Sequence, residues 1–329
     1  MNGGSRNNVP LVSGKGLMLF IFIFIFVVIA VSFLYYIRSL SSFENDRTPY
    51  EHSSLIKSQL EEENKSLEKE VSRLKRELEK CSHVIPPTKK EKRVVSFGLY
   101  GKDPKYTIGA LRNAELVKYI LPGWVCRYYH DKTVPKEVLE QLTEMGAELV
   151  DVSDSGITGD IAGMFWRFLV ADDPTVDRYI IRDVDSRLNP REAAAIEEWI
   201  ESNYAVHSMR DHPNHNYKFN GGMWGAVKGA ITDMKGKILQ WKNRKNYVAD
   251  MDFLGSIIWP IVEGKVLSHD SYHCHRWPNS RPFPTKRIMK EHVGQVFDQL
   301  ETPRKTDIFP FLEAHNPPQC RKKEEWIFG

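Results

Sequence analysis

From residue 94 onward, short apolar runs alternate with amphipathic stretches, and this alternation constrains the fold more than any other feature. The apolar runs predict strands over four ranges, 94–101, 124–131, 147–152 and 177–186. Helical spacing, with proline or glycine at several ends, predicts helices over 107–121, 135–146 and 159–173. Strands that alternate with helices favour an α/β domain over 93–329, with a mostly parallel sheet and flanking helices.

Several function classes are excluded at this stage. The chain contains no GxGxxG, no GxxxxGKS or GxxxxGKT, and no GxSxG. Their absence argues against a dinucleotide oxidoreductase, a P-loop NTPase and an α/β-hydrolase. The net charge of +3, from 46 basic and 43 acidic side chains, is too balanced to imply nucleic acid as the main partner.

Asp183 and Asp185 follow the last of these apolar runs, at the carboxyl end of a predicted strand. Ligands of open α/β sheets bind beyond the carboxyl ends of the strands. Two carboxylates one residue apart favour a cation there, and hard oxygen ligands suit Mg²⁺ or Mn²⁺. A polar turn, in which aspartate is common, is the alternative interpretation.

Around this DxD sequence, further motifs follow an order that resembles the GT-A glycosyltransferases, which are nucleotide-sugar enzymes. The motifs are MFWRFL at 164–169, FNGGMW at 219–224, ADMDFLG at 249–255 and HDSYH at 269–273. They look most like segments of family 8 enzymes, although a Lys-Pro-Trp expected near the end is missing. The resemblance covers nearly all of 94–329. It implies a GT-A, Rossmann-like fold and sugar transfer from a nucleotide-sugar donor to a glycan, protein or lipid acceptor.

The resemblance and the charges together imply roles for individual residues. Asp183, Asp185 and His269 would hold Mn²⁺ or Mg²⁺. The implied donor-binding residues are Gly98, Tyr100, Arg167, Arg182, Gly221 and Gly222, and the implied catalytic residues are Asn220, Asp250 and Asp252. A nucleoside diphosphate leaving group needs its developing charge neutralised, and Arg167 is the best placed cation for this. The motif order also favours retention of anomeric configuration.

These assignments have structural alternatives. Arg167 is equally typical of a helix surface, Asn220 of an ordinary tight turn, and Asp252 of a helix N-terminus. A zinc site is conceivable at His207, His212 and His215, and an acceptor platform, or simply core packing, at Trp224, Trp259 and Trp277. A nucleotidyltransferase or other metal-dependent phosphoryl enzyme is a competing function. So is a catalytically inactive, membrane-anchored sugar-binding protein.

The N-terminal region predicts a membrane anchor. Residues 17–37 contain no charged side chain, and 21 helical residues span roughly 30 Å, enough to cross a bilayer. The distribution of Lys and Arg favours a cytoplasmic tail at 1–16. We therefore expect a single-pass type II protein of the Golgi or ER membrane, with its catalytic domain in the lumen.

The stem at 38–92 contains a heptad pattern over 53–81, with Leu60, Leu67 and Leu74 at d and Val71 among the a positions. This pattern favours a parallel coiled-coil homodimer, and a single solvated helix is the alternative. Asn64 occupies an a position and also begins the sequon Asn-Lys-Ser, so a buried coil position and a glycan there exclude each other. The four cysteines, Cys81, Cys126, Cys274 and Cys320, lack metal-type spacing, and their pairing stays open.

Overall fold

The structure is a computed structural model that describes residues 62–73, 91–243, 245–277 and 279–328. The chain divides into two units, residues 1–88 and Lys89–Gly329. In the first unit, residues 62–73 form a helix in which every residue is exposed. Most of the predicted coil, with Cys81, lies outside the described residues, so the predicted homodimer stays a prediction.

The predicted location in a Golgi or ER membrane is corrected by the structure. Within the described ranges, no helix is long and apolar enough to cross a membrane. The longest helix there, Pro104–Ile120, has 17 residues and carries four charged side chains, Lys105, Arg112, Glu115 and Lys118. The predicted span at 17–37 lies outside the described residues.

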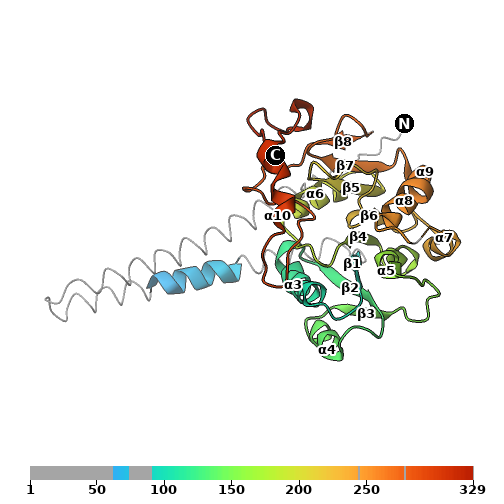
Figure 1. Cartoon of the computed structure of the whole chain (residues 1–329). Coiled ribbons are helices and arrows are strands. Elements are labelled where there is room, and N and C mark those ends of the chain that lie inside the picture. Colours follow the sequence, from blue (N-terminus) through green and yellow to red (C-terminus); the bar gives the residue numbers. More distant parts are fainter. Residues whose placement is uncertain (1–61, 74–90, 244, 278, 329) are drawn as a thin grey trace, which may run out of the picture. The chain divides into compact units, whose positions relative to one another are not determined.

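One eight-stranded sheet forms the centre of the second unit, in the order β3-β2-β1-β4-β6-β5-β7-β8 (Figure 1). The strands are β1 (Arg93–Leu99), β2 (Trp124–His130), β3 (Glu148–Asp151), β4 (Arg178–Arg182), β5 (Val206–Arg210), β6 (Met223–Val227), β7 (Val266–Asp270) and β8 (Ser280–Arg281). Only β6 runs antiparallel to its neighbours, β4 and β5. The prediction of an α/β domain with a mostly parallel sheet is confirmed.

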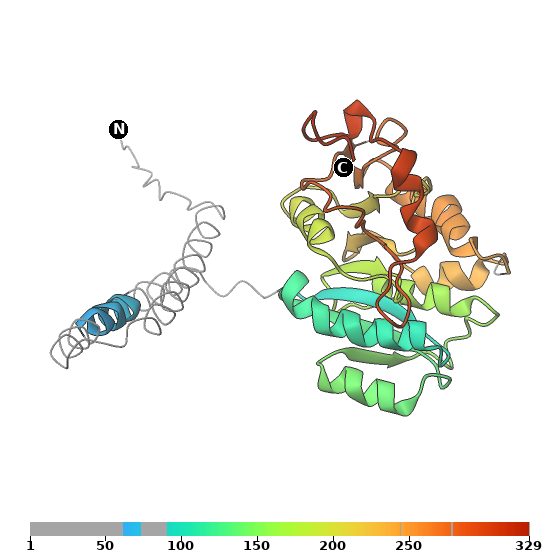
Figure 2. The same cartoon turned by 60° about the vertical axis from the view of Figure 1, so that its left-hand side comes forward.

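Helices cover both faces of this sheet (Figures 1 and 2). The α-helices are α3 (Pro104–Ile120), α4 (Lys136–Glu144), α5 (Ala162–Trp166), α6 (Pro190–Ile200), α7 (Met234–Gln240), α8 (Ala249–Phe253), α9 (Trp259–Val262), α10 (Lys305–Ile308) and α11 (Pro310–Glu313). Three further turns are η1 (Arg167–Asp172), η2 (Leu254–Ile258) and η3 (Pro318–Cys320). Side chains of α3, α4 and α6 pack in one apolar core, and those of α5, α7, α8 and α9 pack in the other.

The two cores form because successive side chains of a strand point to opposite faces of the sheet. Val94 packs in one core and Val95 in the other, and likewise Ile181 and Ile180. A strand buried on both faces therefore reads as a continuous apolar run, which is the signal in the sequence. Proline at the first turn and a side-chain cap begin α3, where Asp103 accepts a hydrogen bond from the Lys105 N–H.

The predicted elements of the first half are present with shifted ends. The helix expected over 159–173 differs most, because it divides into the short helix α5 and the 3₁₀ turn η1, which begins at Arg167. The Arg167 carbonyl accepts a hydrogen bond from Ser96 Oγ of β1, 2.6 Å away. This division places the Arg167 side chain at the edge of the sheet where the parallel strands end.

The C-terminal segment is covalently tied to the domain. A disulfide joins Cys274, which follows β7, to Cys320 of η3, across a sequence separation of 46 residues. Cys126 is a buried free thiol. The pairing that the sequence left open is thus Cys274 with Cys320.

Candidate functional site

A cavity of about 370 Å³ opens at the carboxyl edge of the sheet. Its walls come from the residues after β1, β4 and β5, from the residues that lead into β6, and from the C-terminal segment. β6 is antiparallel, so its beginning lies at the same edge as the ends of its neighbours. Seven of the sequence-predicted site residues line this cavity, Gly98, Tyr100, Arg167, Asp183, Asp185, Asn220 and Gly221.

The two aspartates of the DxD sequence each meet a cation of the chain. Asp183 accepts a short hydrogen bond from Arg167 Nη1, and Asp185 Oδ2 lies 2.7 Å from Lys105 Nζ. Burial and the Asp183 charge raise the pKa of Asp185, and Lys105 opposes this rise. The site therefore concentrates negative charge that only cations stabilise.

Arg167 is buried and holds two carboxylates at once. Its Nη2 atom donates to Asp250 Oδ2 at 2.9 Å, in addition to the bond from Nη1 to Asp183. The Asp250 side chain is 2% exposed, and its burial raises its pKa while Arg167 opposes the rise. The alternative of an arginine on a helix surface does not apply, because Arg167 is only 5% exposed.

Glycines leave the space that these side chains occupy. A Cβ atom on Gly222 would overlap the Asp183 carboxylate, and one on Gly221 would overlap Asp250 and approach Arg167. The Asn-Gly-Gly sequence therefore makes room for the acidic residues of the site, which a sequence reading alone did not indicate. Asn220 itself is buried and donates from Nδ2 to the Met209 carbonyl at 3.3 Å.

Five predicted site residues do not line the cavity. Two of them, Asp250 and Gly222, lie directly behind its wall, in contact with Arg167 and Asp183. The other three lie elsewhere. Arg182 is buried and donates from Nε to Glu192 Oε2 at 2.5 Å, so it supports the first turn of α6. His269 is fully buried within β7, with Nδ1 2.8 Å from His207 Nε2. Asp252 lies in α8 two residues after Asp250 and is half-buried outside the cavity lining.

The histidines arrange differently from the suggested zinc site. His207 pairs with His269 inside the sheet, whereas His212 and His215 line the cavity together with His292. The tryptophans proposed as an acceptor platform pack in or against one apolar core, namely Trp224, Trp259 and Trp277. Sequence reasoning missed several cavity residues, among them Lys105, Tyr247, His292, Arg304 and Asp307. No local motif marks them, since they come together only through the fold.

The donor set at the DxD sequence fits a hard divalent ion. Asp183 and Asp185 supply carboxylate oxygens, and the Asp183 side chain is 40% exposed. Within the described residues, no group of three or more His, Cys, Asp or Glu side chains could hold a metal. Two carboxylates with open positions suit Mg²⁺ or Mn²⁺, which keep waters and bind substrate phosphates.

The sequence matches no protein-family profile and no curated protein. Among solved structures, the chain is similar to a glycosyltransferase involved in glycosylation of the major capsid of PBCV-1, with a TM-score of 0.38 and 19% identity over 55% of this chain and 82% of that one. Glucosyl-3-phosphoglycerate synthase from Mycobacterium tuberculosis matches with a TM-score of 0.35 and 11% identity, over 55% of this chain and 69% of that one. An active-site mutant of LgtC matches with a TM-score of 0.37 and 14% identity, over 54% of this chain and 73% of that one. These structural neighbours are glycosyltransferases.

Proposed function

We propose that this chain is a metal-dependent glycosyltransferase that uses a nucleotide-sugar donor. The observation that carries the proposal is the convergence of Asp183, Asp185, Arg167 and Asn220 in one cavity at the carboxyl edge of the sheet. A cavity of about 370 Å³ also falls in the range of small-molecule sites. The acceptor would be a glycan, a protein or a lipid.

Each residue has a defined task in this proposal. Asp183 and Asp185 would hold Mn²⁺ or Mg²⁺, and a bound ion would supply positive charge to the departing diphosphate. Lys105 and Arg167 neutralise the two aspartates in the present structure. If an ion were held by the two aspartates, Lys105 Nζ and Arg167 Nη1 would be free to bind phosphate or sugar oxygens, while Arg167 Nη2 would keep its bond to Asp250. Asn220 would position the donor.

Retention of anomeric configuration is the stereochemistry that we propose. An inverting enzyme needs a carboxylate or histidine that acts as base on the acceptor hydroxyl. Asp250 is engaged by Arg167, and Asp252 lies outside the cavity lining. Burial lowers the pKa of His292 to about 4, which makes it a weak base. A phosphate oxygen of the leaving group would then take the acceptor proton.

The test is a screen of nucleotide sugars for slow, Mn²⁺-dependent hydrolysis by the purified chain. The single variants Asp183→Asn and Asp185→Asn should lower that turnover by about 100-fold or more, because the charge that holds the ion is removed without a change of shape. Asp154→Asn is the matched control, since Asp154 is exposed and does not line the cavity. Full Mn²⁺-stimulated turnover in the double variant would contradict the proposal.

A further inference from the structure

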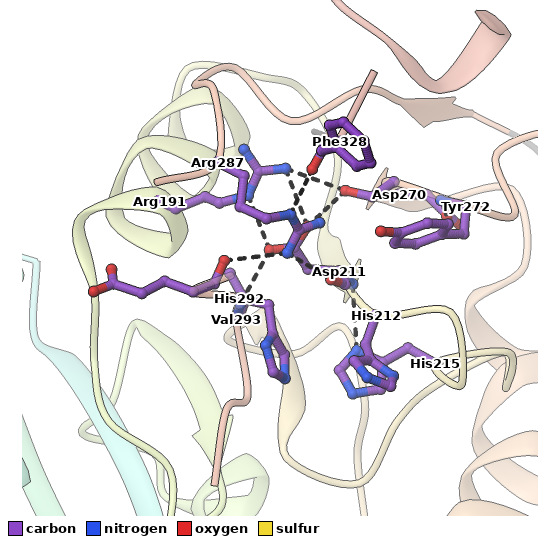
Figure 3. Close-up of polar contacts among 12 residues, drawn as sticks. Arg191, Asp211, His212, His215, Asp270, Tyr272, Arg287, His292, Val293 and Phe328 are labelled. Carbon is purple, nitrogen blue, oxygen red and sulfur yellow. Dashed lines mark hydrogen bonds and ion pairs between the residues drawn. The ribbon is translucent and has the colours of Figure 1, made fainter. Parts of the chain in front are cut away.

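Three histidine rings form a second part of the same cavity (Figure 3). His212 and His215 follow β5, and His292 follows β8 in the C-terminal segment. The His212 ring centroid lies 5.2 Å from that of His215 and 5.0 Å from that of His292, and the last two are 6.1 Å apart. The three rings share the cavity with the DxD aspartates, but the hydrogen bonds of the rings go to Asp211, Asn214, Asp307 and Lys290.

A buried carboxylate fixes the segments that carry the three rings. Asp211 accepts hydrogen bonds from Arg191, Arg287, the Ser271 hydroxyl and the Val293 N–H. The Asp211 N–H donates to His215 Nδ1 at 3.3 Å. Figure 3 shows Asp211 next to both arginines, with His292 and the other two rings close by. Because Val293 directly follows His292, Asp211 holds both the segment after β5 and the segment that carries His292.

The hydrogen bonds define which ring nitrogens stay free. Both nitrogens of His212 are occupied, since Nδ1 accepts from the Asn214 N–H at 3.0 Å and Nε2 donates to the Asp307 carbonyl at 2.9 Å. His215 accepts at Nδ1, so its proton is on Nε2. His292 donates from Nδ1 to the Lys290 carbonyl at 3.4 Å, so its Nε2 carries a lone pair. Within the described chain, neither of these Nε2 atoms has a hydrogen-bond partner.

The trio is uncharged at neutral pH. Burial lowers the pKa of His292 to about 4 and holds the pKa of His215 well below its usual range. Arg191 and Arg287 both pair with Asp211, which leaves this buried group one positive charge, but neither arginine lines the cavity. Arg304 does line it, and it pairs with Asp307 at 2.9 Å. An anion beside the three rings would therefore meet no unpaired cation on this part of the cavity wall.

We infer that His215 and His292 form the acceptor subsite, which binds hydroxyl groups of an uncharged sugar. His215 Nε2 would donate a hydrogen bond and His292 Nε2 would accept one. A sugar hydroxyl, or two neighbouring hydroxyls, can both accept and donate and so would satisfy the two nitrogens. The buried Phe311 ring packs against His212 and His292, with centroids 4.8 Å and 5.0 Å away, and supports these two rings from behind. The inference rests on the proposed function, because only a transferase has an acceptor. It adds the chemical class of that acceptor.

A zinc ion is a poorer occupant of this place. Only two of the three imidazoles have a free nitrogen, whereas a zinc site takes at least three protein ligands. The remaining positions would have to come from other side chains. The part of the chain that the structure describes offers no such group of three.

Histidine-labelled full-length chain provides the test by ¹⁵N NMR. We expect methyl α-D-glucopyranoside, methyl β-D-galactopyranoside or methyl α-D-mannopyranoside to shift the Nε2 resonances of His215 and His292. The exposed His275 should not respond and serves as the internal control. Glucose 6-phosphate is the anionic probe and should bind more weakly. His292→Phe keeps an aromatic ring but removes the acceptor nitrogen, and should weaken glycoside binding about tenfold. The matched variant His275→Phe should not.

The outcomes separate this inference from the proposed function. If nucleotide-sugar hydrolysis is absent but the glycosides still shift His215 and His292, the transferase fails and the sugar subsite stands. If hydrolysis is present and none of the three glycosides shifts these resonances, the subsite is overturned. A stronger response to glucose 6-phosphate would overturn the uncharged class. The wild-type shifts decide the matter even where a variant does not fold.

Discussion

Arg167 illustrates how one buried side chain organises the acidic residues of the cavity. It bonds Asp183, which is exposed to the cavity, and Asp250, which is not. A buried carboxylate without a partner would be strongly destabilising, so Asp250 and Arg167 depend on each other. The same bond holds Asp183 in position before any ion binds. A residue that the sequence suggested for donor binding therefore also positions Asp183, one of the two aspartates proposed to hold the ion.

The histidines predict a pH dependence of stability. Burial lowers the pKa of His292 to about 4, whereas an unfolded histidine titrates near 6.5. Between these values the unfolded chain binds a proton that the folded chain does not, so stability is lost as the pH falls. Both proteins should become less stable from about pH 7 to about pH 5, and the fall in the free energy of unfolding should be about 2 kcal/mol smaller in His292→Phe than in the wild type. Urea denaturation at the two pH values measures both falls. An equal fall in the two proteins would contradict the prediction.

At the scale of single elements, short helices and strand ends decide which residues reach the cavity. In α8, Asp250 and Asp252 lie two residues apart, and such residues point in nearly opposite directions on a helix. Only Asp250 contacts Arg167. The sequence offered both as catalytic, and it could not select one without the helix orientation. The end of β7 gives a second example. The strand continues past His269 to Asp270, so the His269 ring packs between the sheet and α6 and does not reach the cavity.

The helix at 62–73 predicts dimerisation in the stem. Leu67 and Val71 lie one turn apart and are 44% and 41% exposed, although both are apolar. Pairing of two such helices would bury them, because they occupy the d and a positions of the heptads. We expect residues 39–329 to be a dimer and residues 93–329 a monomer by light scattering. Leu67→Asp should give the monomer and Lys65→Asp should not. The same number of chains per particle for both lengths would contradict the prediction.

At the scale of the whole molecule, the C-terminal segment completes the cavity from outside the strand-and-helix alternation. Residues between Cys274 and Cys320 include β8, His292 and Asp307. The Asp307 carbonyl accepts the hydrogen bond from His212 Nε2, so this segment meets the residues after β5 directly. The disulfide therefore closes the loop that carries one side of the proposed acceptor subsite.

Loss of this disulfide should destabilise the domain. Cys274→Ala with Cys320→Ala should lower the free energy of unfolding by about 2–4 kcal/mol, because the unfolded chain gains the freedom of the opened loop. Guanidinium denaturation measures the difference. A reductant should bring the wild-type chain to the stability of the double variant and leave the variant unchanged. Equal stability of the oxidised wild type and the variant would argue against a stabilising cross-link.

The amino-acid order alone determined the α/β class, the position of β1 to β4 and the DxD aspartates at a strand end. These features follow from local patterns, since a buried strand, a capped helix and a turn are each encoded within about ten residues. The tertiary structure decided which side chains share the cavity. Lys105, Tyr247 and His292 lie far apart in the chain, and the predicted ligand His269 lies buried within β7. Such placements depend on how strands order and helices turn, and no short stretch of sequence specifies either.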